Sequence, residues 1–147
     1  MILISHRGNV NGKQPALENM PEYIDNAIEL GYDVEIDIRV KDRIFYLGHD
    51  DAKYVVTIDW LKKRSDKLWL HCKNIEAIEW FAMIKSFNYF WHQNDDITIT
   101  SKGDIWMNSK IQPIKNSIAV ILENSNYSLT KCAGICSDNI KVYNERH

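Results

Sequence analysis

The chain has 147 residues, a formal net charge of −2 and 45% hydrophobic residues. We expect a single domain, residues 1–147, that buries about two-thirds of its unfolded surface. The mixed charges and the lack of a lysine- or arginine-rich stripe argue against nucleic acid as a partner or substrate. No apolar run reaches the length of a membrane span.

The N-terminus starts directly with an apolar strand and lacks the cationic region and long apolar stretch of a signal peptide, which favours a soluble protein in the cytoplasm. The three cysteines are odd in number and have no Cys-x-x-Cys spacing, so we expect buried thiols. A zinc site is the less favoured alternative, because its ligands would have to converge from distant segments: His71, Cys72, Cys132 and Cys136.

Strands and helices alternate at the beginning of the chain. Residues 1–6 predict a strand, and Asn19 is expected to cap a helix that stops at Gly31. Residues 34–40 form the next strand. A tight turn then leads into a strand over 44–47, which returns the chain towards the acidic strand.

The middle of the chain continues this alternation. Thr57 is expected to cap a short helix that ends at Arg64. Alternation over 68–73 predicts a strand with Trp69, His71 and Lys73 on one face, and apolar spacing over 75–86 predicts a helix. Residues 90–92 predict a further strand.

The last third departs from the alternation. Residues 96–100 and 105–107 predict two strands joined by a turn, with no room for a helix between them. Residues 118–122 predict a buried strand, 127–133 a short helix and 135–137 the last strand.

Two carboxylates share one face of the acidic strand. Residues two apart in a strand point to the same side, so Glu35, Asp37 and Arg39 lie together. Two carboxylates about 4 Å apart repel by about 4 kcal/mol at an intermediate dielectric, so an inward-facing pair requires a cation. Oxygen ligands suit Mg²⁺ or Ca²⁺ better than zinc. The alternative is an amphipathic strand whose charged face lies in water.

Short motifs surround this strand in a fixed order: His6-Arg7-Gly8, Glu18-Asn19, Glu35-Ile36-Asp37 and Gly48-His49-Asp50. The ordered set resembles the glycerophosphodiester phosphodiesterase family, with Met20 where that family usually has threonine. The resemblance continues at Leu70-His71-Cys72-Lys73, where Lys73 matches and His71 replaces a metal-binding glutamate, and at the closing strand Gly134-Ile135-Cys136-Ser137-Asp138. About half of the chain carries it.

The resemblance implies an eight-stranded β/α barrel. Such barrels typically need about 250 residues, so we expect a shortened barrel that lacks some helices in its second half. A shortened barrel can expose apolar surface, which a homo-oligomer would cover.

The resemblance also implies a role for each candidate residue. Glu35, Asp37 and His71 would hold a divalent metal, Mg²⁺ or Ca²⁺, and Glu123 is the alternative to His71 as third ligand. The phosphate-binding residues would be Arg7 and Lys73. The residues that move protons would be His6 and His49, with an imidazole pKa near 6.5 that suits both directions of transfer.

The implied activity is metal-dependent hydrolysis of a small glycerophosphodiester to glycerol 3-phosphate and an alcohol. One alternative is a lyase similar to the phospholipase D toxins, which releases a cyclic phosphate. The other is a non-catalytic, degenerate barrel that binds a metal or a phosphate ligand.

Overall fold

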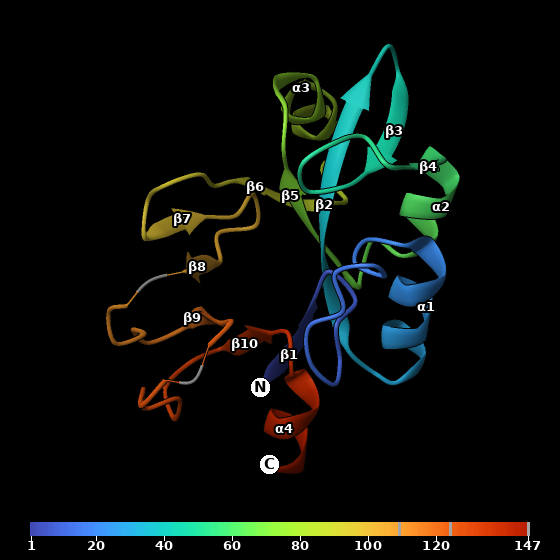
Figure 1. The fold of residues 1–147 in the computed structure, drawn as a ribbon. Helices are drawn as coiled ribbons and strands as arrows, with labels where there is room; N and C mark the ends of the chain where they lie inside the picture. The colour runs from blue at the N-terminus through green and yellow to red at the C-terminus, as the bar shows by residue number, and fades with distance from the viewer. Residues whose placement is uncertain (109, 124, 147) are drawn as a thin grey trace.

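The computed structural model describes residues 1–108, 110–123 and 125–146. Ten strands in these ranges form one sheet, and four helices lie against it (Figure 1). The strands are β1 (Ile2–His6), β2 (Asp33–Lys41), β3 (Ile44–Leu47), β4 (Tyr54–Val56), β5 (Leu68–Cys72), β6 (Asn88–Trp91), β7 (Ile97–Ile99), β8 (Ile105–Met107), β9 (Ser117–Ile121) and β10 (Gly134–Ser137). The helices are α1 (Pro21–Glu29), α2 (Ile58–Lys63), α3 (Ile75–Met83) and α4 (Ile140–Glu145).

The sheet runs in the order β6-β5-β2-β1-β10-β9-β8-β7. All neighbours are parallel except β7, which is antiparallel to β8. The second half of β2 also pairs with β3, which continues antiparallel into β4. The register places His6 beside Glu35 and Asp37 beside His71. Four candidate site residues therefore lie on three adjacent strands.

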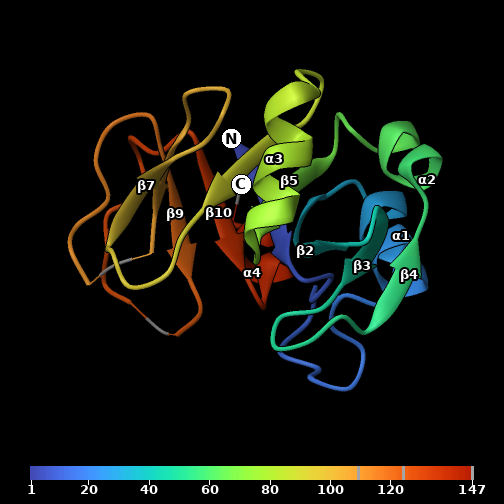
Figure 2. The ribbon, with the colours of Figure 1, turned by 90° about the horizontal axis from the view of Figure 1, so that it is seen from above.

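The expected shortened β/α barrel is wrong. The structure is a curled mixed sheet, dominated by strands, and 21% helical. Turns rather than helices connect β2 to β3 and β7 to β8, so these connections reverse the chain direction. Helices α1, α2 and α3 gather on one side, whereas β7 and β9 lie on the other (Figure 2). The chain lacks the residues to place a helix after every strand.

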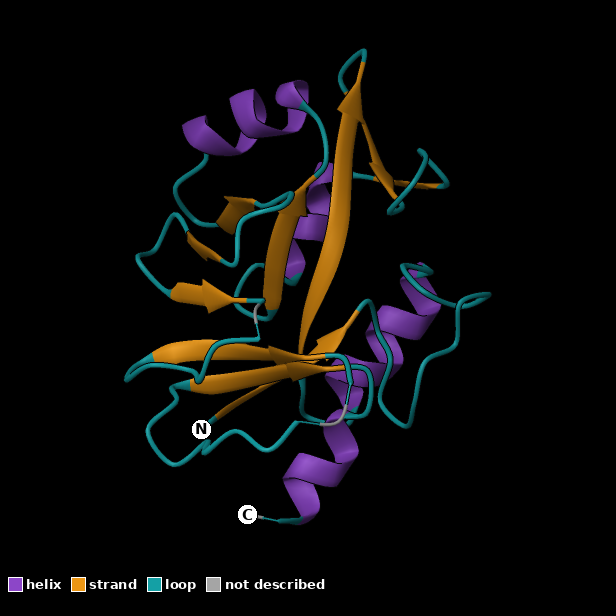
Figure 3. Cartoon of the chain, turned by 60° about the vertical axis from the view of Figure 1, so that its left-hand side comes forward, coloured by secondary structure: helices purple, strands orange, loops and turns teal. Residues whose placement is uncertain are grey.

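Separate apolar clusters hold the two faces of the sheet. Helices α1 and α3 pack their apolar stripes on Ile36 and Ile38 of β2, which alternate with its carboxylates. The concave side holds a cluster of Trp69, Phe90 and Trp106. A third cluster packs α4 against β9 and β10. Figure 3 shows the helices on the outside of the sheet.

Most of the predicted elements are confirmed, including the antiparallel pair β7–β8 and the Thr57 cap, whose Oγ1 accepts a bond from the backbone N–H of Trp60 (3.0 Å). The predicted helix over 127–133 is wrong, because this segment has no helix. The side chain of Gln112 binds both backbone groups of Ser128 there. These bonds compete with helical ones. Sequence reasoning also missed β4 and α4.

The three cysteines are buried and free, as expected. None of the helices in the described ranges has the length and hydrophobicity of a membrane span.

Candidate functional site

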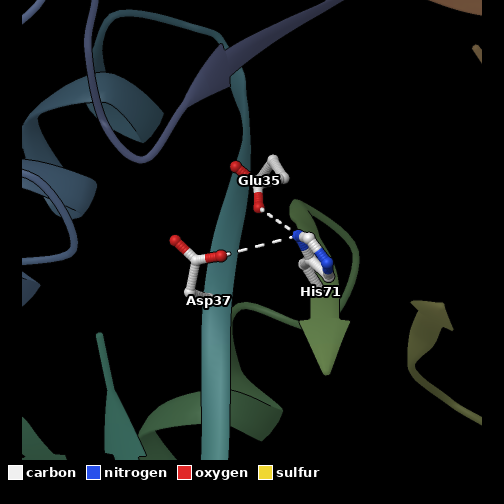
Figure 4. Close-up of side chains that lie close together, drawn as sticks. All are labelled: Glu35, Asp37 and His71. Carbon is white, nitrogen blue, oxygen red and sulfur yellow. Dashed lines mark ion pairs between the residues drawn. The ribbon is translucent and has the colours of Figure 1, made fainter. Parts of the chain in front are cut away.

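The structure brings Glu35, Asp37 and His71 together at the inner face of β2 and β5 (Figure 4). The Nδ1 atom of His71 lies 3.6 Å from Oε1 of Glu35 and 3.5 Å from Oδ1 of Asp37. Both carboxylates are buried, and three of their oxygens accept no hydrogen bond from the described residues. Buried polar atoms are normally satisfied, so this oxygen cluster fits a bound cation.

The His71 ring is fixed by its surroundings. Its Nε2 lies 2.9 Å from the carbonyl oxygen of His92, and the ring stacks on Phe90 with centroids 4.9 Å apart. A carbonyl only accepts, so Nε2 carries a proton and donates. The Nδ1 atom is thereby directed at the carboxylates, in the arrangement expected of a metal ligand whose second nitrogen bonds to a carbonyl.

The two carboxyl groups differ in acidity. Burial raises the pKa of Glu35, but the charge of His6, the contact with His71 and the charge of Arg7 together outweigh burial and lower this pKa to about 2. Burial and the charge of Glu35 raise the pKa of Asp37 above its usual value. One negative charge is therefore well accommodated, whereas the second needs a further cation.

Arg7 supplies part of that compensation. Its Nε forms an ion pair with Oδ2 of Asp37 (2.9 Å), and its Nη1 donates to Oε1 of Glu18 (3.2 Å). Asn19 donates to the same Asp37 oxygen (2.8 Å) and accepts from the Asp37 backbone N–H (3.0 Å). The predicted capping role of Asn19 is wrong, because the residue at the start of α1 is Met20. Asn19 orients Asp37 instead.

His6 ends β1 and makes two contacts with acids. Its Nδ1 lies 2.7 Å from Oδ1 of Asp138, and its Nε2 lies 3.5 Å from Oε2 of Glu35. Asn9, fully buried, donates to Asp138 (2.7 Å) and to Glu18 (2.9 Å). Sequence reasoning gave no role to Asp138 or Asn9. The sequence placed Asp138 directly after the predicted strand 135–137, but the parallel pairing of this strand with β1 is known from the structure alone.

His49 lies in the loop after β3. Its Nδ1 lies 2.8 Å from Oδ1 of Asp50, and 41% of its side chain is exposed. Arg39, on the face of β2 predicted for it, donates to the backbone carbonyls of Gly48 (3.0 Å) and His49 (2.5 Å). Gly48 has φ +154°, and a Cβ there would lie 2.0 Å from the Asp51 carbonyl oxygen. The loop conformation therefore requires glycine.

One cavity of about 470 Å³ collects most of the predicted site. Its lining includes two of the predicted metal ligands, Glu35 and His71, and both predicted phosphate-binding residues, Arg7 and Lys73. The two predicted proton-transfer residues, His6 and His49, line it as well. A second cavity of about 440 Å³ shares Arg7 and His49 with the first. Glu123, the alternative third ligand, is exposed and lines other cavities. The structure thus places His71, and not Glu123, beside the carboxylates.

The chain matches no protein-family model, no curated protein and no solved structure in the comparisons with known proteins. The site geometry therefore carries the functional argument.

The contacts of His6 predict a pH-dependent stability. Burial lowers the pKa of His6, but Glu35 and Asp138 outweigh burial and raise it above 6.5. A raised pKa stabilises the fold fully below pH 6.5, and this contribution is lost as the pH rises through the raised value. In chelator, we expect the free energy of unfolding to fall over that range in the wild type and to fall less in His6→Asn. Urea denaturation from pH 5 to 9 measures the free energy of unfolding of both proteins. The same pH dependence in the wild type and in His6→Asn would contradict the prediction.

Proposed function

We propose that the chain is a metal-dependent phosphodiesterase that hydrolyses a small glycerophosphodiester to glycerol 3-phosphate and a free alcohol. The observation that supports this most is the pair of buried carboxylates, Glu35 and Asp37, in contact with the Nδ1 atom of His71. Three further imidazoles, of His6, His49 and His92, and the two cations Arg7 and Lys73 line the same cavity. The likeness of the ordered motifs to the glycerophosphodiester phosphodiesterase family agrees with this proposal.

The three ligands suit a divalent ion. Two carboxylates favour Mg²⁺ or Ca²⁺, and one imidazole is compatible with a site of mixed oxygen and nitrogen ligands. Bound there, the ion would neutralise charge on a non-bridging phosphate oxygen. The carboxylate oxygens that lack hydrogen bonds in the described structure are the atoms available to it: Oε1 and Oε2 of Glu35 and Oδ1 of Asp37.

Arg7 and Lys73 supply positive charge for the phosphate. Both line the cavity, and Lys73 follows β5 directly, with its backbone N–H donating to the Ile38 carbonyl (2.9 Å). Their ammonium and guanidinium groups stabilise the charge that grows on the phosphate oxygens in the transition state.

Both histidines have Nδ1 bonded to a carboxylate, whereas Nε2 of His6 lies at the longer distance of 3.5 Å from Oε2 of Glu35. Asp138 binds Nδ1 of His6, and Asp50 binds Nδ1 of His49. Each Nε2 is therefore the atom that exchanges protons with the reactants. One Nε2 takes a proton from the attacking water, and the other gives a proton to the leaving alkoxide. Phosphodiester and water thereby yield a phosphomonoester and an alcohol.

The test is release of glycerol 3-phosphate from a panel of glycerophosphodiesters in Mg²⁺, Ca²⁺, Mn²⁺ or chelator. We expect release in at least one metal, none in chelator, and a loss of about 10²- to 10⁴-fold in kcat for His6→Ala and for His49→Ala. Exposed Asp50 variants are unsuitable as controls, because Asp50 binds His49. Glu79→Gln, an exposed site on α3, is the control.

Two other outcomes would contradict the proposed hydrolysis. A cyclic phosphate that persists under turnover would indicate the lyase. No turnover by folded protein with any diester or metal would indicate a binding module.

A further inference from the structure

The cavity of the candidate site has two halves of different chemistry. Residues from β1, β2 and the end of β5 form the first half, which carries the charges described above. The second half comes from the segment after β6, from β8 and its end, and from β9 and its end. It presents three amide side chains over an apolar floor, and we call it the amide lobe: Gln93, Asn94, Asn108, Trp106, Val120 and Leu122. His92 lines the same half, with its Nε2 bonded to the carbonyl oxygen of Asp95.

We propose that the amide lobe binds a neutral, hydroxyl-bearing alcohol arm of the phosphodiester, such as glycerol or a cyclic polyol. This inference rests on the proposed function, because the arm reaches the lobe only when the phosphate lies between Lys73 and Arg7. The cavity volume of about 470 Å³ lies in the range of small-molecule sites.

Amides and hydroxyls have matching hydrogen-bonding properties. A hydroxyl both donates and accepts, and each amide side chain offers two donor hydrogens and an acceptor oxygen. Gln93 and Asn94 are exposed at the cavity rim, and Asn108 faces the same cavity. The apolar floor, with Trp106 only 3% exposed, can contact the carbon skeleton of the same arm.

A cationic alcohol finds no counter-charge in the amide lobe. The acids nearest along the chain are Asp95, which is exposed and lines neither this cavity nor the adjoining one of about 680 Å³, and Asp96 and Glu123, which line that adjoining cavity. Glu35 is the carboxylate that lines the site cavity in the described residues, and it faces His6 and His71. One largely covered tryptophan also provides no aromatic cage for a quaternary ammonium group.

The second cavity accommodates the other substituent of the phosphate, the glycerol arm that all glycerophosphodiesters share, so that the diesters compared below differ only in the arm offered to the amide lobe. A phosphodiester carries two arms on one phosphorus atom, and the two cavities share Arg7 and His49. The second cavity is lined by charged groups of both signs, including Lys13, Lys53 and Asp51. The amide lobe therefore differs from it in carrying uncharged hydrogen-bonding groups, and selection for a neutral arm belongs to the amide lobe.

The experiment compares kcat/KM for glycerophosphoglycerol and glycerophosphoinositol with that for glycerophosphocholine and glycerophosphoethanolamine. We expect the neutral arms to be preferred by about tenfold, as two or more hydrogen bonds would give. Asn94→Asp and Asn108→Asp keep the side-chain shape and add a negative charge, so each is expected to shift the ratio about three- to tenfold towards the cationic arms. The ratio of kcat/KM between neutral and cationic diesters is used because any effect of a substitution on phosphate binding is the same for all four substrates and cancels. Asn26→Asp, on the exposed face of α1, is the matched control.

Binding provides a readout without turnover. Calorimetric titration of the same four diesters into His6→Ala, with Mg²⁺, is expected to show tighter binding of the neutral pair. Equal rates and affinities for both pairs, or a preference for the cationic pair, would overturn the amide-lobe inference and leave the phosphodiesterase function intact. Absence of turnover in the wild type would overturn the proposed function, and the binding order of the four diesters would then decide the inference alone.

Discussion

Replacing Glu35 by Gln, or Asp37 by Asn, is expected to abolish the stabilisation of the fold by divalent ions. A ligand that binds only the folded state stabilises it by about 2.7 kcal/mol at 100 times its Kd. For a chain of this size we therefore expect the wild-type melting temperature to rise by about 5–10 °C in saturating Mg²⁺ or Ca²⁺. Each variant loses carboxylate oxygens that have no hydrogen bond in the described structure.

Differential scanning calorimetry with each metal and with chelator measures this effect. The control is Glu79→Gln on α3, which removes an exposed carboxylate and should keep the full rise. A rise that persists in both site variants would place the ion elsewhere. A wild type that no divalent ion stabilises would contradict the metal site.

Arg7→Met is expected to lower the free energy of unfolding by about 3–5 kcal/mol, since it leaves buried carboxylates without their partner. Asp37 is fully buried, and Glu18 is 10% exposed in its side chain. Arg7→Lys keeps the charge but cannot reproduce the two-sided guanidinium contact, so it should lie between the wild type and Arg7→Met.

Arg64→Met is the matched comparison for this loss. Arg64 pairs with Asp25 through two contacts of 2.6 and 3.0 Å, but the two side chains are 22% and 37% exposed, more than those of Arg7 and Asp37. An exposed pair contributes about 1 kcal/mol or less. Urea denaturation of the two variants in chelator measures the difference. If both variants lost the same free energy of unfolding, the prediction that burial makes the Arg7 ion pairs stronger would be wrong.

The strand periodicity predicted that Glu35 and Asp37 share one face, whereas His71 entered the predicted site through the family resemblance. Glu35 and Asp37 alternate with apolar residues on β2, and parallel pairing with β5 then brings His71 to the same face. These relations depend on local geometry, with side chains two apart on one face, and on strands lying side by side. They do not require knowledge of how many helices surround the sheet.

The failed predictions concern choices that tertiary contacts decide. Asn19 has the residue type and position of a helix cap, yet Asp37 offers its side chain two bonds. Residues 127–133 have few strong helix formers, and Gln112 takes the backbone groups of Ser128. Asp138 lies 132 residues from His6, so no local pattern could reveal this contact. The helix-poor architecture likewise follows from pairing across the whole chain.

The uneven cover of the sheet has a consequence for local mobility. Helices pack on the outer face of β2, whereas β7 leaves Ile97 and Ile99 exposed, and no helix lies over β7 and β8 in Figure 1. Strands with few buried apolar contacts open at lower free energy, so their amide hydrogens exchange with solvent sooner. We therefore expect the amides of β7 to exchange sooner than those of β2, which carries the carboxylates. The segments that flank β7, which include Asn94, can then adjust their shape while the charged groups on β1, β2 and β5 keep their spacing.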